Sequence, residues 1–108
     1  MERIFMKRIL LSADGEISVF NVPDEVADNL EQYCLEFCRD WLHKSPDAEK
    51  YRTKMGDVIG VCFNEKDFID YLNQYICDEQ SALITTLTDV YVGDELPAEY
   101  KELPYFNF

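Results

Sequence analysis

The sequence predicts one α+β domain in which a small antiparallel sheet packs against two amphipathic helices. Three observations support this fold class: two β-leaning segments joined by an Asp-Gly turn, two stretches with helical periodicity, and a late run of β-branched residues. The chain has 108 residues, the size of one ordinary domain. Seven Tyr, seven Phe and one Trp make it far richer in aromatic residues than a disordered chain, so a folded core is expected.

The N-terminal part predicts a β-hairpin. Residues 3–11 and 16–22 are apolar and rich in residues that favour strands. Between them lies Asp14-Gly15, and an Asp-Gly pair favours the positive φ angles of a type I′ turn. These two segments are therefore expected to pair as the two strands of a β-hairpin.

Residues 23–43 predict a long amphipathic helix. Pro23 suits a first helical turn, where the amide that proline lacks would be unpaired. Apolar residues then recur at spacings of three and four, the period of one helix face: Val26, Leu30, Tyr33, Phe37 and Trp41, with Cys34, Cys38 and Leu42 beside them. The opposite face is mostly acidic, with Glu25, Asp28, Gln32, Glu36, Arg39 and Asp40. Ser45-Pro46 is expected to end the helix.

The middle of the chain predicts a helical turn and then a loop over residues 46–54. The apolar run at 58–63 predicts a short buried strand. Asn64 is a good N-cap, with Asp67 three residues later, for a second helix at about residues 65–78. Its expected buried stripe is Phe68, Ile69, Leu72, Tyr75 and Ile76.

The C-terminal part predicts one more strand and a tail. Residues 82–92 are rich in β-branched residues, which suits a strand that ends at Gly93. One short helical turn is expected at 97–102. All strands are expected to form one antiparallel sheet, with both helices on one face of it.

The charge is the main functional clue. The formal net charge is −12, and residues 57–108 hold eleven acidic residues against two basic ones, Lys66 and Lys101. Like charges repel, so direct binding to nucleic acid or to an anionic membrane is not expected. A partner recognised by charge should be a basic protein. The competing interpretation is that the acidic residues form only a solvated face.

The cysteines and the lack of a leader sequence predict a cytoplasmic protein. Cys34, Cys38, Cys62 and Cys77 follow no cleavable signal, so free thiols in a reducing compartment are expected. No apolar stretch approaches the ~18 residues of a membrane span.

Metal binding and catalysis are two alternative interpretations of the sequence. Cys34 and Cys38 lie four residues apart on one helix face, and His43 and Cys62 would complete a zinc site. Both helix cysteines fall on the apolar arc, however, which favours core thiols. No nucleophile elbow, P-loop or Rossmann glycine cluster is present, and His43 has no partner pattern around it. No cofactor and no enzymatic activity are therefore expected.

Candidate partner-binding residues come from the acidic second half and from the aromatic tail. They are Asp67, Asp70, Asp94, Glu95, Glu99, Glu102, Tyr105 and Phe106. Tyr and Phe are frequent interface anchors, so the tail is a candidate docking segment. Two alternatives are that the tail folds back on the core, or that it is exchanged between copies in a homo-oligomer.

In its size, its charge and its lack of catalytic motifs, the chain resembles the anti-CRISPR proteins, which are small acidic inhibitors from phages and mobile elements. The resemblance implies a non-enzymatic inhibitor of a basic nucleic-acid-binding protein such as a CRISPR effector, acting by nucleic-acid mimicry or by blocking a groove. It carries over no functional residue. Immunity proteins and antitoxins against basic toxins have the same character, and a small metal-binding module or enzyme is the alternative from another class.

Overall fold

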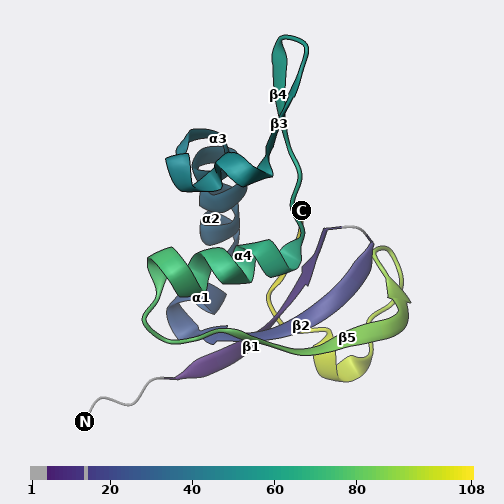
Figure 1. Ribbon diagram of the computed structural model, residues 1–108. Coiled ribbons are helices and arrows are strands. Elements are labelled where there is room, and N and C mark those ends of the chain that lie inside the picture. The colour runs from purple at the N-terminus through teal and green to yellow at the C-terminus, as the bar shows by residue number, and fades with distance from the viewer. Residues whose placement is uncertain (1–4, 14) are drawn as a thin grey trace.

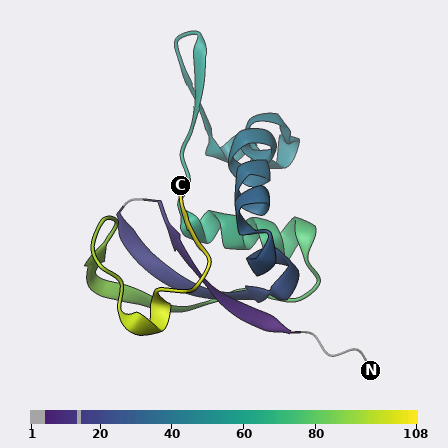
Figure 2. The same ribbon diagram turned by 180° about the vertical axis from the view of Figure 1, so that it is seen from behind.

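The computed structural model describes residues 5–13 and 15–108 and has the predicted α+β fold. A four-stranded sheet carries the helices on one face and the C-terminal tail on the other, and a second, two-stranded sheet projects from the body (Figures 1 and 2). The elements are β1 (Met6–Ser12), β2 (Glu16–Pro23), α1 (Asp24–Asp28), α2 (Leu30–Leu35), η1 (Glu36–Trp41), α3 (Leu42–Lys44), η2 (Pro46–Tyr51), β3 (Arg52–Met55), β4 (Val58–Val61), α4 (Glu65–Tyr71), η3 (Leu72–Ile76), β5 (Ala82–Tyr91), η4 (Ala98–Tyr100) and β6 (Tyr105–Asn107).

The main sheet has the strand order β5-β2-β1-β6. The predicted hairpin is confirmed as β1 and β2, which pair antiparallel from Met6 opposite Pro23 to Ser12 opposite Ile17. Gly15 has a φ of 98°, as its turn requires, whereas Asp14 and residues 3 and 4 of the first predicted strand lie outside the described residues.

The sheet is mixed, so the expectation of a purely antiparallel sheet was wrong. β5 pairs antiparallel with β2, but β6 runs parallel to β1. The reason is the path of the tail, which crosses the far face of the sheet before it reaches the free edge of β1 (Figure 2). The amide of Leu10 donates to the carbonyl of Pro104 over 2.8 Å, and the amide of Phe108 donates to the carbonyl of Ser12 over 2.7 Å.

The first predicted helix spans the expected stretch but is not continuous. It breaks at Asn29, whose φ of −128° and ψ of 36° separate α1 from α2. The Asn29 side-chain amide donates to the carbonyl of Glu25 over 3.0 Å, a local bond that competes with regular helix. The following turn, η1, is π-helical, and the helical region ends before Ser45 as predicted.

The second helix begins as predicted. The Asn64 side chain accepts from the amide of Asp67, and the Asp67 carboxylate accepts from the amide of Asn64, which forms a capping box. The helix continues from α4 into the π-helical turn η3. Tyr75 and Ile76 are 47% and 44% exposed, so their assignment to the buried stripe was wrong. The wider π turn moves them off the face that α4 presents to the sheet.

The core forms on both faces of the sheet because side chains alternate along each strand. Ile9, Leu11 and Phe20 pack beneath the helices. On the other face, Leu10, Ile17 and Val19 pack against residues of β5 and of the tail: Leu87, Val90, Leu96, Tyr100 and Leu103. The expectation that both helices lie on one face is therefore confirmed.

The second sheet corrects two predictions. Residues 52–54, expected in a loop, belong to β3, and the apolar run expected to be a buried strand forms β4, with Val58 64% and Ile59 56% exposed. β3 and β4 pair only with each other in the described structure, and together they project as a finger (Figure 1). Val58 and Ile59 lie on the part of the finger that no other layer covers, so their side chains stay in solvent whatever their hydropathy.

Candidate partner-binding site

The eight predicted site residues do not form one surface. Asp67 and Asp70 lie on α4, on the helix-bearing face of the sheet. The other acidic candidates, Asp94, Glu95, Glu99 and Glu102, lie in the tail segment that covers the opposite face (Figure 2). The sheet separates the two groups, so a single flat partner surface would not contact both.

Three of these carboxylates already have structural partners. Asp67 belongs to the capping box, and Asp94 accepts from the amide of Tyr91 over 3.0 Å in the turn after β5. Glu95 forms an ion pair of 2.8 Å with Lys101. Among the described residues, no ion pair or side-chain hydrogen bond involves Asp70, Glu99 or Glu102, which are exposed. These three are therefore the predicted acids with charge free for a partner.

The aromatic tail is largely part of the core. The Phe108 ring lies 5.4 Å from the ring of Phe63 and 4.9 Å from the ring of Phe106. Phe106 is partly buried against the same cluster, so it serves packing. Tyr105 points outward and is 38% exposed, although partial burial still raises the pKa of its hydroxyl.

The candidate zinc ligands are spread through the structure. Cys34 is fully buried in the core, and this burial raises the pKa of its thiol. Cys38 is half-buried, whereas Cys62 and His43 are exposed. Within the described ranges, no three His, Cys, Asp or Glu side chains are grouped closely enough to hold a metal ion.

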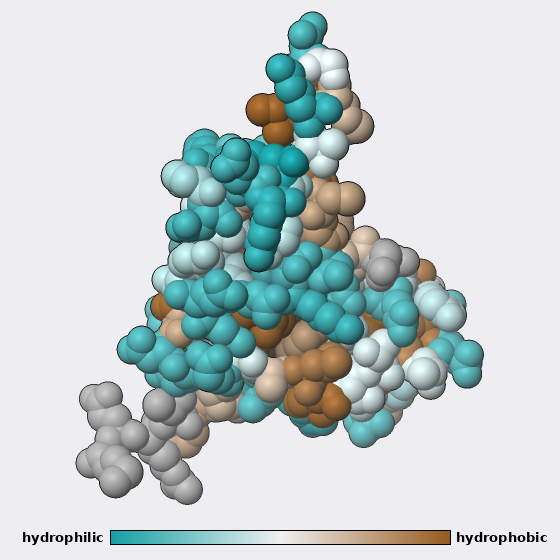
Figure 3. Space-filling view, viewed as in Figure 1, coloured by the Kyte–Doolittle hydropathy of each residue, from teal (hydrophilic) through white to brown (hydrophobic). Residues whose placement is uncertain are grey.

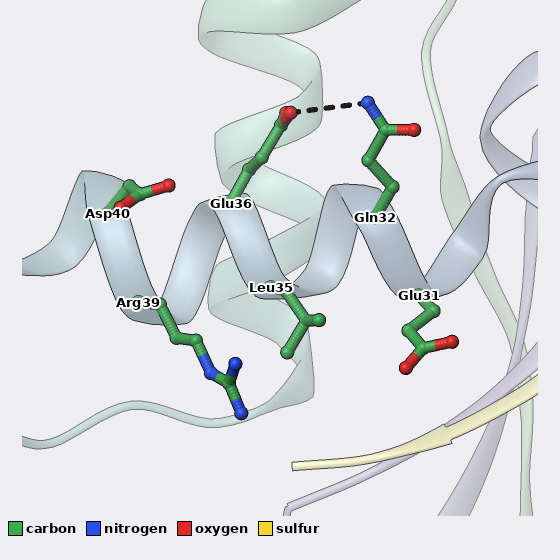
Figure 4. Close-up of a pocket in the computed structure, with 6 residues that line it drawn as sticks. All are labelled: Glu31, Gln32, Leu35, Glu36, Arg39 and Asp40. Carbon is green, nitrogen blue, oxygen red and sulfur yellow. Dashed lines mark hydrogen bonds between the residues drawn. The ribbon is translucent and has the colours of Figure 1, made fainter.

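A more coherent surface lies on the outer side of α2 and η1. Gln32, Glu36 and Asp40 follow one side of the helix, and Glu31, Leu35 and Arg39 follow the other side (Figure 4). The Gln32 side-chain amide donates to Glu36 over 3.3 Å, which orients that carboxylate. Together the six side chains line a shallow depression of about 490 Å³.

A second depression adjoins the first, and a third adjoins the second. One of about 450 Å³ shares Glu36 and Asp40 and adds an aromatic wall of Trp41 and Tyr71. The next shares that wall and is lined further by residues of η2, α4 and η3. We refer to the continuous surface as the aromatic–acidic face, made of Glu36, Asp40, Trp41, Asp47, Tyr51, Asp70, Tyr71 and Tyr75.

The aromatic rings of this face are held together by the crossing of the two helices. The Trp41 ring lies 5.0 Å from Tyr71, 5.2 Å from Tyr75 and 6.1 Å from Tyr51. Trp41 ends the π turn η1, and Tyr75 lies in the π turn η3. π turns are rare and recur at functional sites. Because two of them meet at one aromatic cluster, this face is the candidate functional surface.

The face is acidic and is already able to hold a cation. Burial and the nearby carboxylates of Glu36 and Asp40 raise the pKa of Tyr71, which keeps its hydroxyl neutral. The ammonium group of Lys50 lies 5.0 Å from the centre of the Tyr51 ring, which is a cation–π contact.

Most of the negative charge is not neutralised inside the molecule. In the part of the chain that the structure describes, three ion pairs form: Lys7 with Asp28, Lys44 with Asp40, and Lys101 with Glu95. Figure 3 shows hydrophilic side chains over the helices on the viewed face, and apolar groups gathered on the finger and over β5. The helix layer thus presents exposed carboxylates, among them Glu36 and Asp70, to solvent.

Sequence reasoning missed the aromatic half of this face. Trp41 and Tyr75 fit the buried stripes of their helices, so the sequence predicts both in the core, whereas in the structure Trp41 is partly buried and Tyr75 is exposed. The acidic face of the first helix was recognised, but Glu36 and Asp40 were not named as binding residues. The signal available in the sequence was the spacing of four residues between Gln32, Glu36 and Asp40, which places all three on one side of a helix.

Comparison of the chain with known protein families, with curated proteins and with solved structures found no match. None of the helices in the described ranges is long and apolar enough to cross a bilayer.

Proposed function

We propose that this protein is a non-enzymatic binding protein that inhibits a basic, nucleic-acid-handling protein by occupying its nucleic-acid groove. The observation that carries the proposal is the set of exposed carboxylates on the helices, Glu36, Asp40 and Asp70, beside the partly exposed ring of Trp41 and the exposed ring of Tyr75. Carboxylates held at fixed spacing attract a positively charged groove, and aromatic residues anchor the contact once it forms. The net charge of −12 adds long-range steering toward such a partner.

A CRISPR effector is the partner class that this mechanism suits best. Such effectors hold their nucleic acid in a positively charged channel and recognise its backbone geometry rather than its sequence. An acidic face of this kind would compete for that channel. All four cysteines are free thiols, which suits a protein that works in the cytoplasm.

Charge reversal on the two sides of the sheet tests the proposal. A variant with Glu36→Lys and Asp70→Lys changes the aromatic–acidic face, and a variant with Glu99→Lys and Glu102→Lys changes the tail by the same net charge. Purified CRISPR effectors would be titrated with each variant while displacement of a labelled nucleic acid is followed. We expect the first variant to lose displacement and the second to keep most of it.

Ionic strength provides the second readout. Displacement should weaken strongly between about 50 mM and about 500 mM NaCl, because exposed charges are screened over shorter distances at high salt. Displacement that is unchanged by salt and by both reversals would contradict the proposed function. If only the tail variant lost displacement of the nucleic acid, the binding surface would lie on the other side of the sheet.

A further inference from the structure

We propose that the aromatic–acidic face binds an arginine side chain of the basic partner, with its guanidinium group over Trp41 and its charge paired with Glu36 and Asp40. This inference rests on the proposed function and names the group that the face recognises. The guanidinium would lie in the depression of about 450 Å³ that these three residues help to line.

The first argument is the combination of groups in this depression. A cation over an indole ring is attracted by the negative face of the ring, and tryptophan provides the strongest such contact. Carboxylates beside the ring add charge-assisted hydrogen bonds. Glu36 and Asp40 line the depression together with Trp41, so one bound group can make both kinds of contact.

The second argument explains why arginine is favoured over lysine. A guanidinium group is planar and weakly hydrated, so it can stack on an aromatic ring and donate to a carboxylate at the same time. An ammonium group is a compact, strongly hydrated charge that cannot stack. Phe37 stacks on the Trp41 ring from the core side at 5.8 Å, so a flat group entering the open depression would lie on the part of the ring that stays exposed.

The third argument is that the chain already places cations at this face. Lys50 lies over the ring of Tyr51, and Lys44 pairs with Asp40 over 3.4 Å. Both members of the Lys44 pair are largely exposed, so the contact is weak and an incoming guanidinium group can replace it. Lys44 therefore competes with the proposed ligand for the same carboxylate.

The experiment uses Trp41, which is the only tryptophan of the chain, as an internal probe. The full protein is titrated with a short oligo-arginine peptide and with an oligo-lysine peptide of equal length, both with blocked ends, while Trp41 fluorescence is recorded. We expect the arginine peptide to change the fluorescence and to bind about fivefold more tightly than the lysine peptide.

Two matched variants locate the site. Lys44→Gln should tighten arginine-peptide binding about threefold by freeing Asp40, whereas Lys101→Gln changes the net charge equally but releases Glu95 in the tail, and should tighten binding less. Glu36→Gln should weaken binding, and Glu99→Gln should have little effect. All four positions are exposed, so these variants are expected to fold.

The outcomes separate the two proposals. Salt-sensitive binding of both peptides with equal affinity, and equal effects of Lys44→Gln and Lys101→Gln, would overturn the arginine site while leaving the proposed function standing. Binding of neither peptide at low salt would contradict both. Preference for arginine that survives Trp41→Leu, measured by calorimetry, would overturn the stacking on Trp41.

Discussion

The hydroxyl of Ser18 on β2 donates a hydrogen bond of 3.3 Å to Oε1 of Glu65, in the first turn of α4. Glu65 is only 7% exposed, and its Oε2 has no partner among the described residues. The hydroxyl of Thr86 on β5 lies 3.3 Å from that of Ser18, so three elements meet at this polar contact. The contact joins α4 to the sheet in the middle of an otherwise apolar layer.

Removing one partner of this contact should cost more than removing both. Ser18→Ala leaves the buried carboxylate without its hydroxyl donor and should lower the free energy of unfolding by about 2 kcal/mol. Adding Glu65→Met should restore most of that loss, because an apolar side chain of similar size needs no donor. Urea denaturation of the two single variants and the double variant measures the coupling. If the losses of unfolding free energy in the two single variants simply added in the double variant, the hydrogen bond would contribute nothing specific to stability.

Phe108 should contribute far more to stability than Tyr105, although both lie in the C-terminal tail. The Phe108 ring contacts the rings of Phe63 and Phe68 at 5.4 Å and 5.7 Å, so Phe108→Ala should cost about 3 kcal/mol. Tyr105→Ala removes a side chain that points outward and should cost less than about 1 kcal/mol. Thermal and urea unfolding compare the two variants. Equal losses would mean that the tail packs differently from its position in the structure.

The free energy of unfolding should fall as the pH rises above the ordinary pKa of a thiol. Burial raises the pKa of Cys34 above its usual 9.0, so above that pH the unfolded chain loses a proton that the folded chain keeps. The stabilisation that comes from the raised Cys34 pKa is complete below pH 9.0. Above that pH, the free energy of unfolding falls by about 1.4 kcal/mol per pH unit for this one group. Urea denaturation between about pH 8 and about pH 11 measures the slope.

Cys34→Ala is the control for the alkaline effect. The variant should be less stable at neutral pH, because it leaves a cavity in the core, but its stability should depend less on pH above 9.0. Burial also raises the pKa of Tyr71, so some slope should remain at higher pH. A slope unchanged by the substitution would assign the effect to groups other than Cys34.

The finger formed by β3 and β4 should tolerate polar residues at its tip. Val58→Thr with Ile59→Thr changes two exposed side chains and should alter the free energy of unfolding by less than about 0.5 kcal/mol each. Ile9→Thr, which places a hydroxyl in the core, is the buried counterpart and should cost several-fold more. Hydrogen exchange should show faster exchange for the amides of β3 and β4 than for those of β1 and β2, because the finger has no second layer.

Local signals predicted most of the elements. The capping box at Asn64 and Asp67, the stop at Ser45-Pro46 and the glycine turn before β2 are short-range features, so their physics is visible in a few adjacent residues. The break at Asn29 and the π turns were not predicted, because their residues fit the periodicity of a regular helix. The acidic side of the first helix was predicted, but its relation to Trp41 and Tyr75 was not.

The sequence by itself determined the α+β class, the two helical regions, the N-terminal hairpin and the strong negative charge. Only the tertiary structure decided that β6 joins the sheet in parallel, that the sheet separates two groups of acidic residues, and that an apolar run such as Val58-Ile59 stands in solvent. The reason is that periodicity reports which side of an element is apolar, whereas burial depends on which other element covers that side. Helix crossing, not local pattern, brings Trp41 and Tyr75 together beside the carboxylates.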